Sequence, residues 1–202
     1  MAGKRPIDPA PAGRREFFRH SIHGLLRPLA DFLEERLPPP LPEHILRPPG
    51  ALPETRFLET CYRCGNCAAA CPVNAIKLLH VRDAKRTGTP YVEPNVAACV
   101  ACQEVACTKA CPSGALSLIT DSRQIDMGLA VVDDNLCVRS RGQDCTLCVD
   151  KCPIGRDAIR LDEAGWVYVI KEGCVGCGVC QLYCPTTPKA VVVHPPSHKR
   201  IG

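Results

Sequence analysis

The sequence predicts an α+β fold in which two modules of short β-hairpins and small helices follow an N-terminal helix and a proline-rich strap. Three observations support this prediction. Sixteen of the 202 residues are cysteine, and they form four groups that each end in Cys-Pro. Short segments rich in Val, Ile, Leu and Tyr separate the groups, which is typical of strands. Aromatic residues make up only 4% of the chain, so they cannot fill a core of ordinary composition.

The spacing of the cysteines distinguishes between three kinds of cysteine-rich protein. The groups, each followed by proline, are Cys61, Cys64, Cys67 and Cys71; Cys99, Cys102, Cys107 and Cys111; Cys137, Cys145, Cys148 and Cys152; and Cys174, Cys177, Cys180 and Cys184. Disulfide scaffolds scatter their cysteines, and structural zinc sites pair two C-x2-C turns across a longer spacer. The first and fourth groups instead have the C-x2-C-x2-C-x3-C-P spacing of bacterial ferredoxins. We therefore predict two ferredoxin-like modules that hold four [4Fe–4S] clusters, with all sixteen cysteines as ligands.

Three glycines lie inside the first and fourth groups, at Gly65, Gly176 and Gly178. Glycine adopts positive φ angles without strain, so a tight loop can turn its amide N–H groups toward thiolates and sulfides. We expect these glycines to shape the loops and to let the backbone approach the clusters closely.

The fourth cysteine of each group predicts that the groups work in pairs. In two-cluster ferredoxins this cysteine binds the other cluster of the pair. Spacing allows adjacent pairing, of groups one with two and three with four, or nested pairing, of groups one with four and two with three. The third group has a longer first gap, CVRSRGQDC, which we interpret as an exposed loop insertion. The alternative is a partner-facing loop that presents Arg139 and Arg141.

Composition along the chain predicts five segments. Residues 1–13 are rich in Pro, Ala and Gly and are expected to be disordered. Residues 14–37 have the apolar spacing of an amphipathic helix. Residues 38–54 form a proline-rich strap, which is expected to be extended. The four-cluster domain covers residues 55–194, and residues 195–202 form an irregular tail.

Short elements are expected between the cysteine groups. The segments TPYVEP, ALSLIT, GLAVVDD and WVYVI are predicted strands of small hairpins. Helical turns are predicted after some of the Cys-Pro sites.

The arginine pair in RREFFR, residues 14–19, resembles the start of a twin-arginine export signal. Such a signal also needs an uncharged apolar region, and here that region holds His20, His23, Arg27 and Asp31. We therefore predict a retained helix and a cytoplasmic protein, with membrane association only through a partner. A degenerate signal that is exported together with a partner is the alternative. The sequence has no apolar run of about 18 residues, so no transmembrane segment is predicted.

The chain resembles the NapG/MauM family of ferredoxin-type proteins, associated with periplasmic nitrate reduction and methylamine utilisation. The resemblance lies in CYRCGNCAAACPVNAIKLL, GTPYVEPNVAACVACQEVACTKACPSGAL, DMGLAVVDDNLC, DCTLCVDKCPIGRDAI and CVGCGVCQLYCP. More distantly, the chain resembles the four-cluster electron-transfer subunits of the dimethyl sulfoxide reductase family, which share the spacing of the second group. This second resemblance favours nested pairing. The implied sets are Cys61, Cys64, Cys67 and Cys184; Cys174, Cys177, Cys180 and Cys71; Cys99, Cys102, Cys107 and Cys152; and Cys137, Cys145, Cys148 and Cys111.

The resemblance implies an electron conduit between a quinol-oxidising membrane protein and a terminal redox enzyme. The residues agree, since no G-x-G-x-x-G segment after a strand, P-loop or Ser/His/Asp constellation indicates a substrate site. A net charge of +4 does not single out nucleic acid as a partner. We predict an electron-transfer protein rather than an enzyme, with the N-terminal helix as a docking element. The alternative is a maturation or scaffold protein for a partner oxidoreductase.

Overall fold

The computed structural model describes residues 39–40 and 45–196. The predicted disorder of residues 1–13 and the predicted helix over residues 14–37 lie outside the described residues, as do residues 197–202 of the tail. All sixteen cysteines lie inside the described part. No helix in that part combines the length and the apolar character needed to cross a membrane.

The second half of the described chain forms one ferredoxin-like module. Its elements are β3 (Leu129–Val132), η2 (Val138–Arg141), α5 (Leu147–Asp150), η3 (Gly155–Asp157), β4 (Ile159–Leu161), β5 (Val167–Val169), α6 (Val179–Tyr183) and β6 (Val191–His194). The outer strands β3 and β6 pair antiparallel, and β4 pairs with β5 as a hairpin. Along β6 the buried Val191 and Val193 alternate with half-buried residues, as expected for a strand with one face on a core.

The first half repeats this order with a weaker outer pair. Its elements are α2 (Glu54–Thr60), α3 (Asn66–Ala69), β1 (Ile76–Leu78), β2 (Pro90–Val92), α4 (Ala106–Lys109) and η1 (Ser122–Gln124). The hairpin β1–β2 lies between the two cysteine groups. In place of an outer ladder, this module has a single antiparallel bridge between Ala51 and Leu116. The predicted strands in TPYVEP, GLAVVDD and WVYVI are therefore confirmed as β2, β3 and β5, whereas ALSLIT forms only that bridge.

One-turn helices occur at the same place in all four cysteine groups. The third cysteine of each group is the second residue of α3, α4, α5 or α6. This position turns the cysteine inward, and all four third cysteines are buried. The predicted helical turns after some Cys-Pro sites are found at one of the four, where η3 follows Pro153, while the four one-turn helices lie earlier in the groups. The turn is needed earlier, where the chain reverses after the second cysteine.

From residue 45 onward, the predicted strap packs against the cluster domain. Residues 45–49 are buried, and Ala51 pairs with Leu116. Arg47 is 2% exposed, and its guanidinium forms two hydrogen bonds of 2.9 and 2.7 Å with the Glu54 carboxylate at the start of α2. The packed domain thus includes at least residues 45–54, which precede the predicted start at residue 55. The physical reason is that the apolar and proline residues of this segment cover the first module's core.

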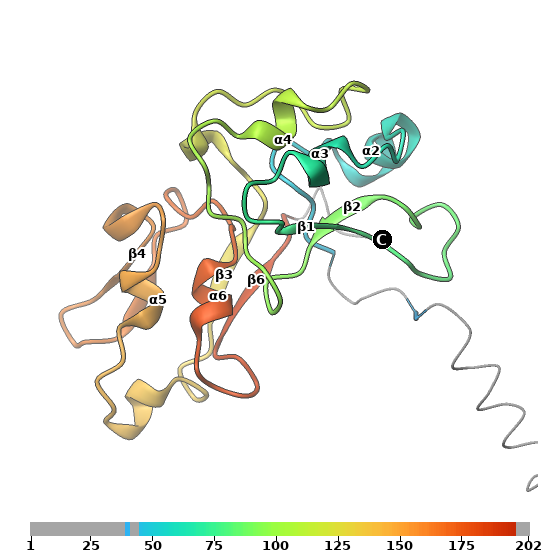
Figure 1. Cartoon of the computed structure of the whole chain (residues 1–202). Helices are drawn as coiled ribbons and strands as arrows, with labels where there is room; N and C mark the ends of the chain where they lie inside the picture. The colour runs from blue at the N-terminus through green and yellow to red at the C-terminus, as the bar shows by residue number, and fades with distance from the viewer. Residues whose placement is uncertain (1–38, 41–44, 197–202) are drawn as a thin grey trace, which may run out of the picture. The chain divides into compact units, whose positions relative to one another are not determined.

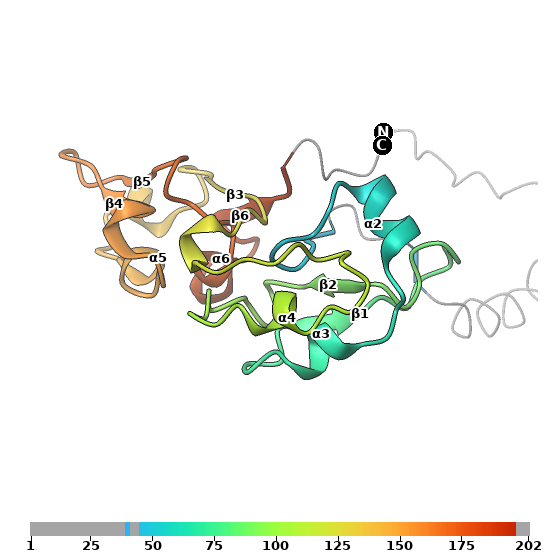
Figure 2. The same ribbon diagram turned by 90° about the horizontal axis from the view of Figure 1, so that it is seen from above.

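The two modules share one hydrophobic core. The backbone of Cys99 in the first module donates a hydrogen bond of 3.0 Å to the carbonyl of Cys177 in the second. Gln181 Nε2 donates to Asn95 Oδ1 at 3.0 Å, so α6 is tied to the segment that follows β2. Figures 1 and 2 show α6 with the β3–β6 pair between α5 on one side and the α3–α4 pair on the other.

The backbone conformation of Gly176 leads to a testable prediction. Gly65, Gly176 and Gly178 all have positive φ, as expected. A Cβ on Gly176 would lie 2.3 Å from the backbone nitrogen of Gly128, next to β3. We expect Gly176→Ala to separate β3 from the fourth cysteine group, because backbone cannot move aside as a flexible side chain does.

Gly155→Ala is the matched control, because Gly155 also has positive φ but an added Cβ would meet nothing within 4 Å. The control should cost about 1–2 kcal/mol for the left-handed conformation alone. Gly176→Ala should cost roughly 1–3 kcal/mol more through overpacking. The difference is measured as the shift in denaturant midpoint under anaerobic conditions, and equal midpoints for the two variants would contradict the predicted clash.

Candidate iron–sulfur sites

The sixteen cysteines gather into four sets, each with three cysteines from one group and the fourth from another. Site A comprises Cys61, Cys64, Cys67 and Cys111; site B comprises Cys71, Cys99, Cys102 and Cys107; site C comprises Cys152, Cys174, Cys177 and Cys180; and site D comprises Cys137, Cys145, Cys148 and Cys184. The cysteines of site B line one cavity, those of site C a second and those of site D a third. At site A, the charged neighbours of Cys67 are Cys61, Cys111 and Cys64.

These sets correct the nested pairing implied by the reductase-subunit resemblance. Cys184 lies with the third group rather than the first, and Cys71 lies with the second group rather than the fourth. Groups one and two exchange their fourth cysteines, and so do groups three and four. The correction has a physical cause, because each hairpin, β1–β2 or β4–β5, joins two consecutive groups and folds them onto each other.

The cavities suit a cluster of several atoms. All sixteen cysteines are free of disulfides. At site B the remaining lining is apolar and includes Pro49, Ile76, Val105 and Ile125. Four sulfur donors around an apolar cavity fit an iron–sulfur cluster, whose iron is bound by cysteine thiolates.

Burial raises the pKa of several of the cysteine thiols in all four sites. Desolvation raises the pKa to about 11 at Cys67 and Cys148 and to about 12 at Cys99, Cys107 and Cys177. Neighbouring cysteines raise it further, because two thiolates repel each other. These thiols therefore stay protonated near neutral pH unless a cation compensates the charge. A cluster held by these cysteines would have to displace the protons, so its assembly would depend on pH.

The fourth cysteine of the second and fourth groups has the opposite shift. Burial alone would raise the pKa of Cys111, but the Leu116 amide and the Ser113 hydroxyl outweigh it, and the pKa is lowered. At Cys184 the Thr186 hydroxyl and backbone amides likewise outweigh burial and lower the pKa. The thiolate form of these two cysteines is therefore favoured relative to that of an ordinary cysteine.

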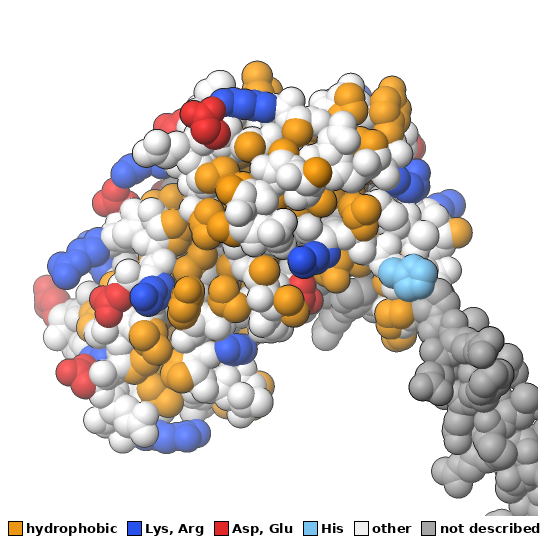
Figure 3. Space-filling model, viewed as in Figure 1, with side chains coloured by type: hydrophobic (Ala, Val, Ile, Leu, Met, Phe, Trp, Pro, Cys, Tyr) orange, Lys and Arg blue, Asp and Glu red, His pale blue; other side chains and the backbone are white. Residues whose placement is uncertain are grey.

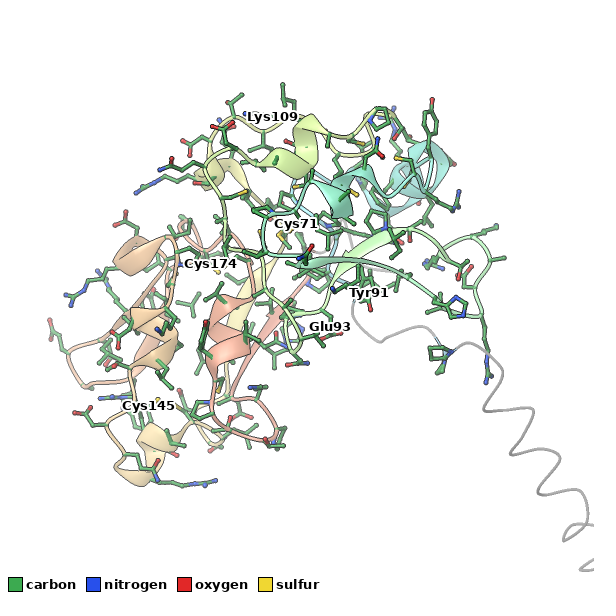
Figure 4. The ribbon with its side chains drawn as sticks, viewed as in Figure 1. Cys71, Tyr91, Glu93, Lys109, Cys145 and Cys174 are labelled. Carbon is green, nitrogen blue, oxygen red and sulfur yellow. The ribbon has the colours of Figure 1, made fainter. Side chains whose placement is uncertain are left out.

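The four sites form a row. Three pairs of cysteines show which sites are neighbours, because each pair has its two members in two different sites. In each pair the charge of one cysteine raises the pKa of the other. Cys67 and Cys107 join A to B, Cys99 and Cys177 join B to C, and Cys148 and Cys180 join C to D. Along the row the cysteine groups follow the order one, two, four, three. Figure 4 shows Cys71 and Cys174 between the modules and Cys145 farther out, in the loop that precedes α5.

The long gap of the third group forms an exposed loop, in agreement with its interpretation as an insertion. Residues 140–144 are exposed, while Cys137 still lines the cavity of site D. Arg139 does not face outward as the alternative required. Its side chain is 15% exposed and donates to the carbonyls of Gly165 at 2.5 Å and Cys145 at 3.0 Å. Arg139 therefore holds the loop in place, and only Arg141 is exposed.

The paired modules and the four-cysteine sets define the class of the molecule, which is a ferredoxin-type protein that binds [4Fe–4S] clusters. Family models agree with this class. The model described as "4Fe-4S dicluster domain" matches residues 60–115, which hold groups one and two together, and the model described as "4Fe-4S binding domain" matches residues 171–187.

The chain belongs to the MauM/NapG family of ferredoxin-type proteins. It is 41% identical over 160 residues to the methylamine utilization ferredoxin-type protein MauM of Methylophilus methylotrophus, a match that covers 75% of this chain and 71% of that protein. It is 37% identical over 165 residues to the ferredoxin-type protein NapG of Escherichia coli (strain K12), which covers 74% of this chain and 70% of NapG. The chain is thus an electron-transfer iron–sulfur protein of the ferredoxin type.

Proposed function

We propose that sites A, B, C and D each hold one [4Fe–4S] cluster, with the sixteen cysteines as iron ligands, and that electrons pass along the row between two protein partners. The row of neighbouring sites is the observation that carries this proposal. Each cluster supplies a centre that accepts and returns one electron. The chain's own residues space the centres and exclude water from the inner sites, because Ile76, Val105, Ile159 and Val193 close around them.

The two ends of the row offer different surroundings to a partner. At site A, Cys64 is exposed and Tyr62 beside it is 72% exposed. At site D, Leu147, which precedes Cys148, is exposed. Figure 3 shows Lys/Arg and Asp/Glu side chains interspersed along the rim of one face rather than a block of one charge.

We propose that one partner is a membrane protein that oxidises quinol and that the other is a terminal oxidoreductase. The test is anaerobic purification of the tagged chain from its native cells, with iron and sulfide counted on the eluate. Co-purification of both partners with four clusters per chain supports the proposal. A chain that elutes fully loaded but alone supports a mobile ferredoxin, and rapid transfer of its clusters to an apo acceptor supports the maturation role.

Truncation at two points separates docking from folding. Removal of residues 1–44 is expected to leave four clusters in place and to weaken partner binding. Removal of residues 1–53 is expected to lose clusters as well, because it deletes Arg47 and the bridge between Ala51 and Leu116. Iron content and partner retention of the two truncated chains are measured side by side. Unchanged partner binding after removal of residues 1–44 would exclude the N-terminal segment as the docking element.

A further inference from the structure

A hydroxyl group lies beside the fourth cysteine at both ends of the row. The residue two positions after Cys111 of site A is Ser113, and the residue two positions after Cys184 of site D is Thr186. The Ser113 oxygen lies 3.6 Å from Cys111 Sγ, and the Thr186 oxygen lies 3.2 Å from Cys184 Sγ. Sulfur is larger than oxygen, so both distances are hydrogen-bonding contacts.

The direction of these hydrogen bonds follows from the local backbone. The Ser113 oxygen accepts the Ala115 amide at 3.3 Å, and the Thr186 oxygen accepts the Ala190 amide at 2.7 Å. Each oxygen thus already serves as an acceptor, which leaves its O–H free to point at sulfur. A cysteine bound to iron has lost its proton and can only accept. At both ends of the row the hydroxyl must therefore be the donor.

The two inner sites have apolar side chains at the same position. Val73 follows Cys71 of site B, and Ile154 follows Cys152 of site C, each by two residues. Cys71 Sγ accepts an amide hydrogen bond from Ala75 at 3.3 Å, but a valine or isoleucine cannot add a hydroxyl donor. The residue at this position therefore depends on the place of the site in the row. It is a hydroxyl donor at the two end sites, A and D, and an apolar residue at the two middle sites, B and C.

We propose that Ser113 and Thr186 set the reduction potentials of the two outer clusters above those of the two inner clusters. Reduction adds one electron to a cluster that already carries negative charge with its four thiolates. A hydrogen bond to a ligand sulfur stabilises that added charge and raises the potential. An electron that enters the protein is then held mainly by the cluster of site A or site D. It passes through the clusters of sites B and C without accumulating there. The inference rests on the proposed binding of four clusters.

The test is an anaerobic redox titration of the full-length, cluster-loaded chain, monitored by electron paramagnetic resonance. Ser113→Ala and Thr186→Val should each lower the midpoint potential of one component, and in both variants that component should belong to the higher pair of the wild type. Ser113→Thr and Thr186→Ser keep a hydroxyl and should therefore keep the wild-type midpoint potential. Ser117→Ala is the control, because Ser117 is exposed and is not one of the two hydroxyl residues that hydrogen-bond a cysteine sulfur among the described residues, so it should change nothing.

The converse substitutions test the same idea at the inner sites. Val73→Thr and Ile154→Thr should each raise the midpoint potential of one component of the lower pair. The inference is overturned if Ser113→Ala and Thr186→Val leave all four potentials unchanged, or if the shift falls on the lower pair. Iron and sulfide counts on each sample keep the two proposals apart, because fewer than four clusters in the wild type contradicts the proposed function instead.

Discussion

Replacement of Cys71 and Cys99 together by alanine is expected to remove one cluster, whereas replacement of Cys71 and Cys174 together is expected to damage two. In the structure Cys71 and Cys99 belong to site B, and Cys174 belongs to site C. The two double variants remove the same number of cysteines and share Cys71, so they differ only in how the losses are distributed. Iron and sulfide content, with the spectra of the remaining clusters, measures the outcome.

Nested pairing predicts the reverse result. It places Cys71 with Cys174, so their joint loss would affect one cluster, while loss of Cys71 and Cys99 would affect two. A second set of double variants, which share Cys184 instead of Cys71, repeats the test at other sites. Cys184→Ala with Cys145→Ala should affect site D alone, and Cys184→Ala with Cys61→Ala should affect sites D and A.

Arg47→Ala is expected to destabilise the cluster-loaded protein by about 3–5 kcal/mol, because it leaves the buried Glu54 carboxylate without its main partner. Glu54 is 7% exposed, and its remaining partner is Arg86 at 3.3 Å. The substitution also removes hydrogen bonds to the Thr89 hydroxyl and the Pro90 carbonyl, and the contact of the guanidinium with the Phe57 ring. Anaerobic urea denaturation, followed by circular dichroism and visible absorbance, measures the loss.

Two control variants identify the cause. The double variant Arg47→Met with Glu54→Leu removes both charges and should recover most of the loss, since a hydrophobic pair often replaces a buried ion pair without cost. Lys109→Ala breaks the exposed ion pair with Glu104 and should leave the denaturation midpoint nearly unchanged. If the double variant were as unstable as Arg47→Ala, packing and not the uncompensated charge would explain the effect.

The cysteine pattern predicted more of the molecule than the rest of the sequence did. Its spacing predicted the class of cofactor, and the segments between the groups predicted three of the observed strands. The spacing could not predict which groups pair. Adjacent and nested pairing use identical motifs and differ only in which loops fold onto each other. The hairpins β1–β2 and β4–β5 decide this by joining consecutive groups.

The strap shows why other features were missed. Residues 45–49, with the sequence ILRPP, suggested an extended exposed chain, because prolines and an arginine usually lie at the surface. Burial of Arg47 depends on Glu54, Thr89 and Pro90, and the last two lie more than forty residues away along the chain. Likewise, Ser113 and Thr186 can be read from the sequence as residues that follow Cys-Pro. Only the order of the four sites shows that both lie at the ends of the row.

That order also determines when each site can be completed during synthesis. Sites A and B have all their cysteines once residue 111 has left the ribosome. Site C needs Cys180 and site D needs Cys184, so both remain incomplete until the last group emerges. The link between the modules is made by that same group, through Cys177. In the proposed four-cluster protein, sites A and B could therefore be filled before sites C and D, and the second pair of sites would be completed almost together with the contact between the halves.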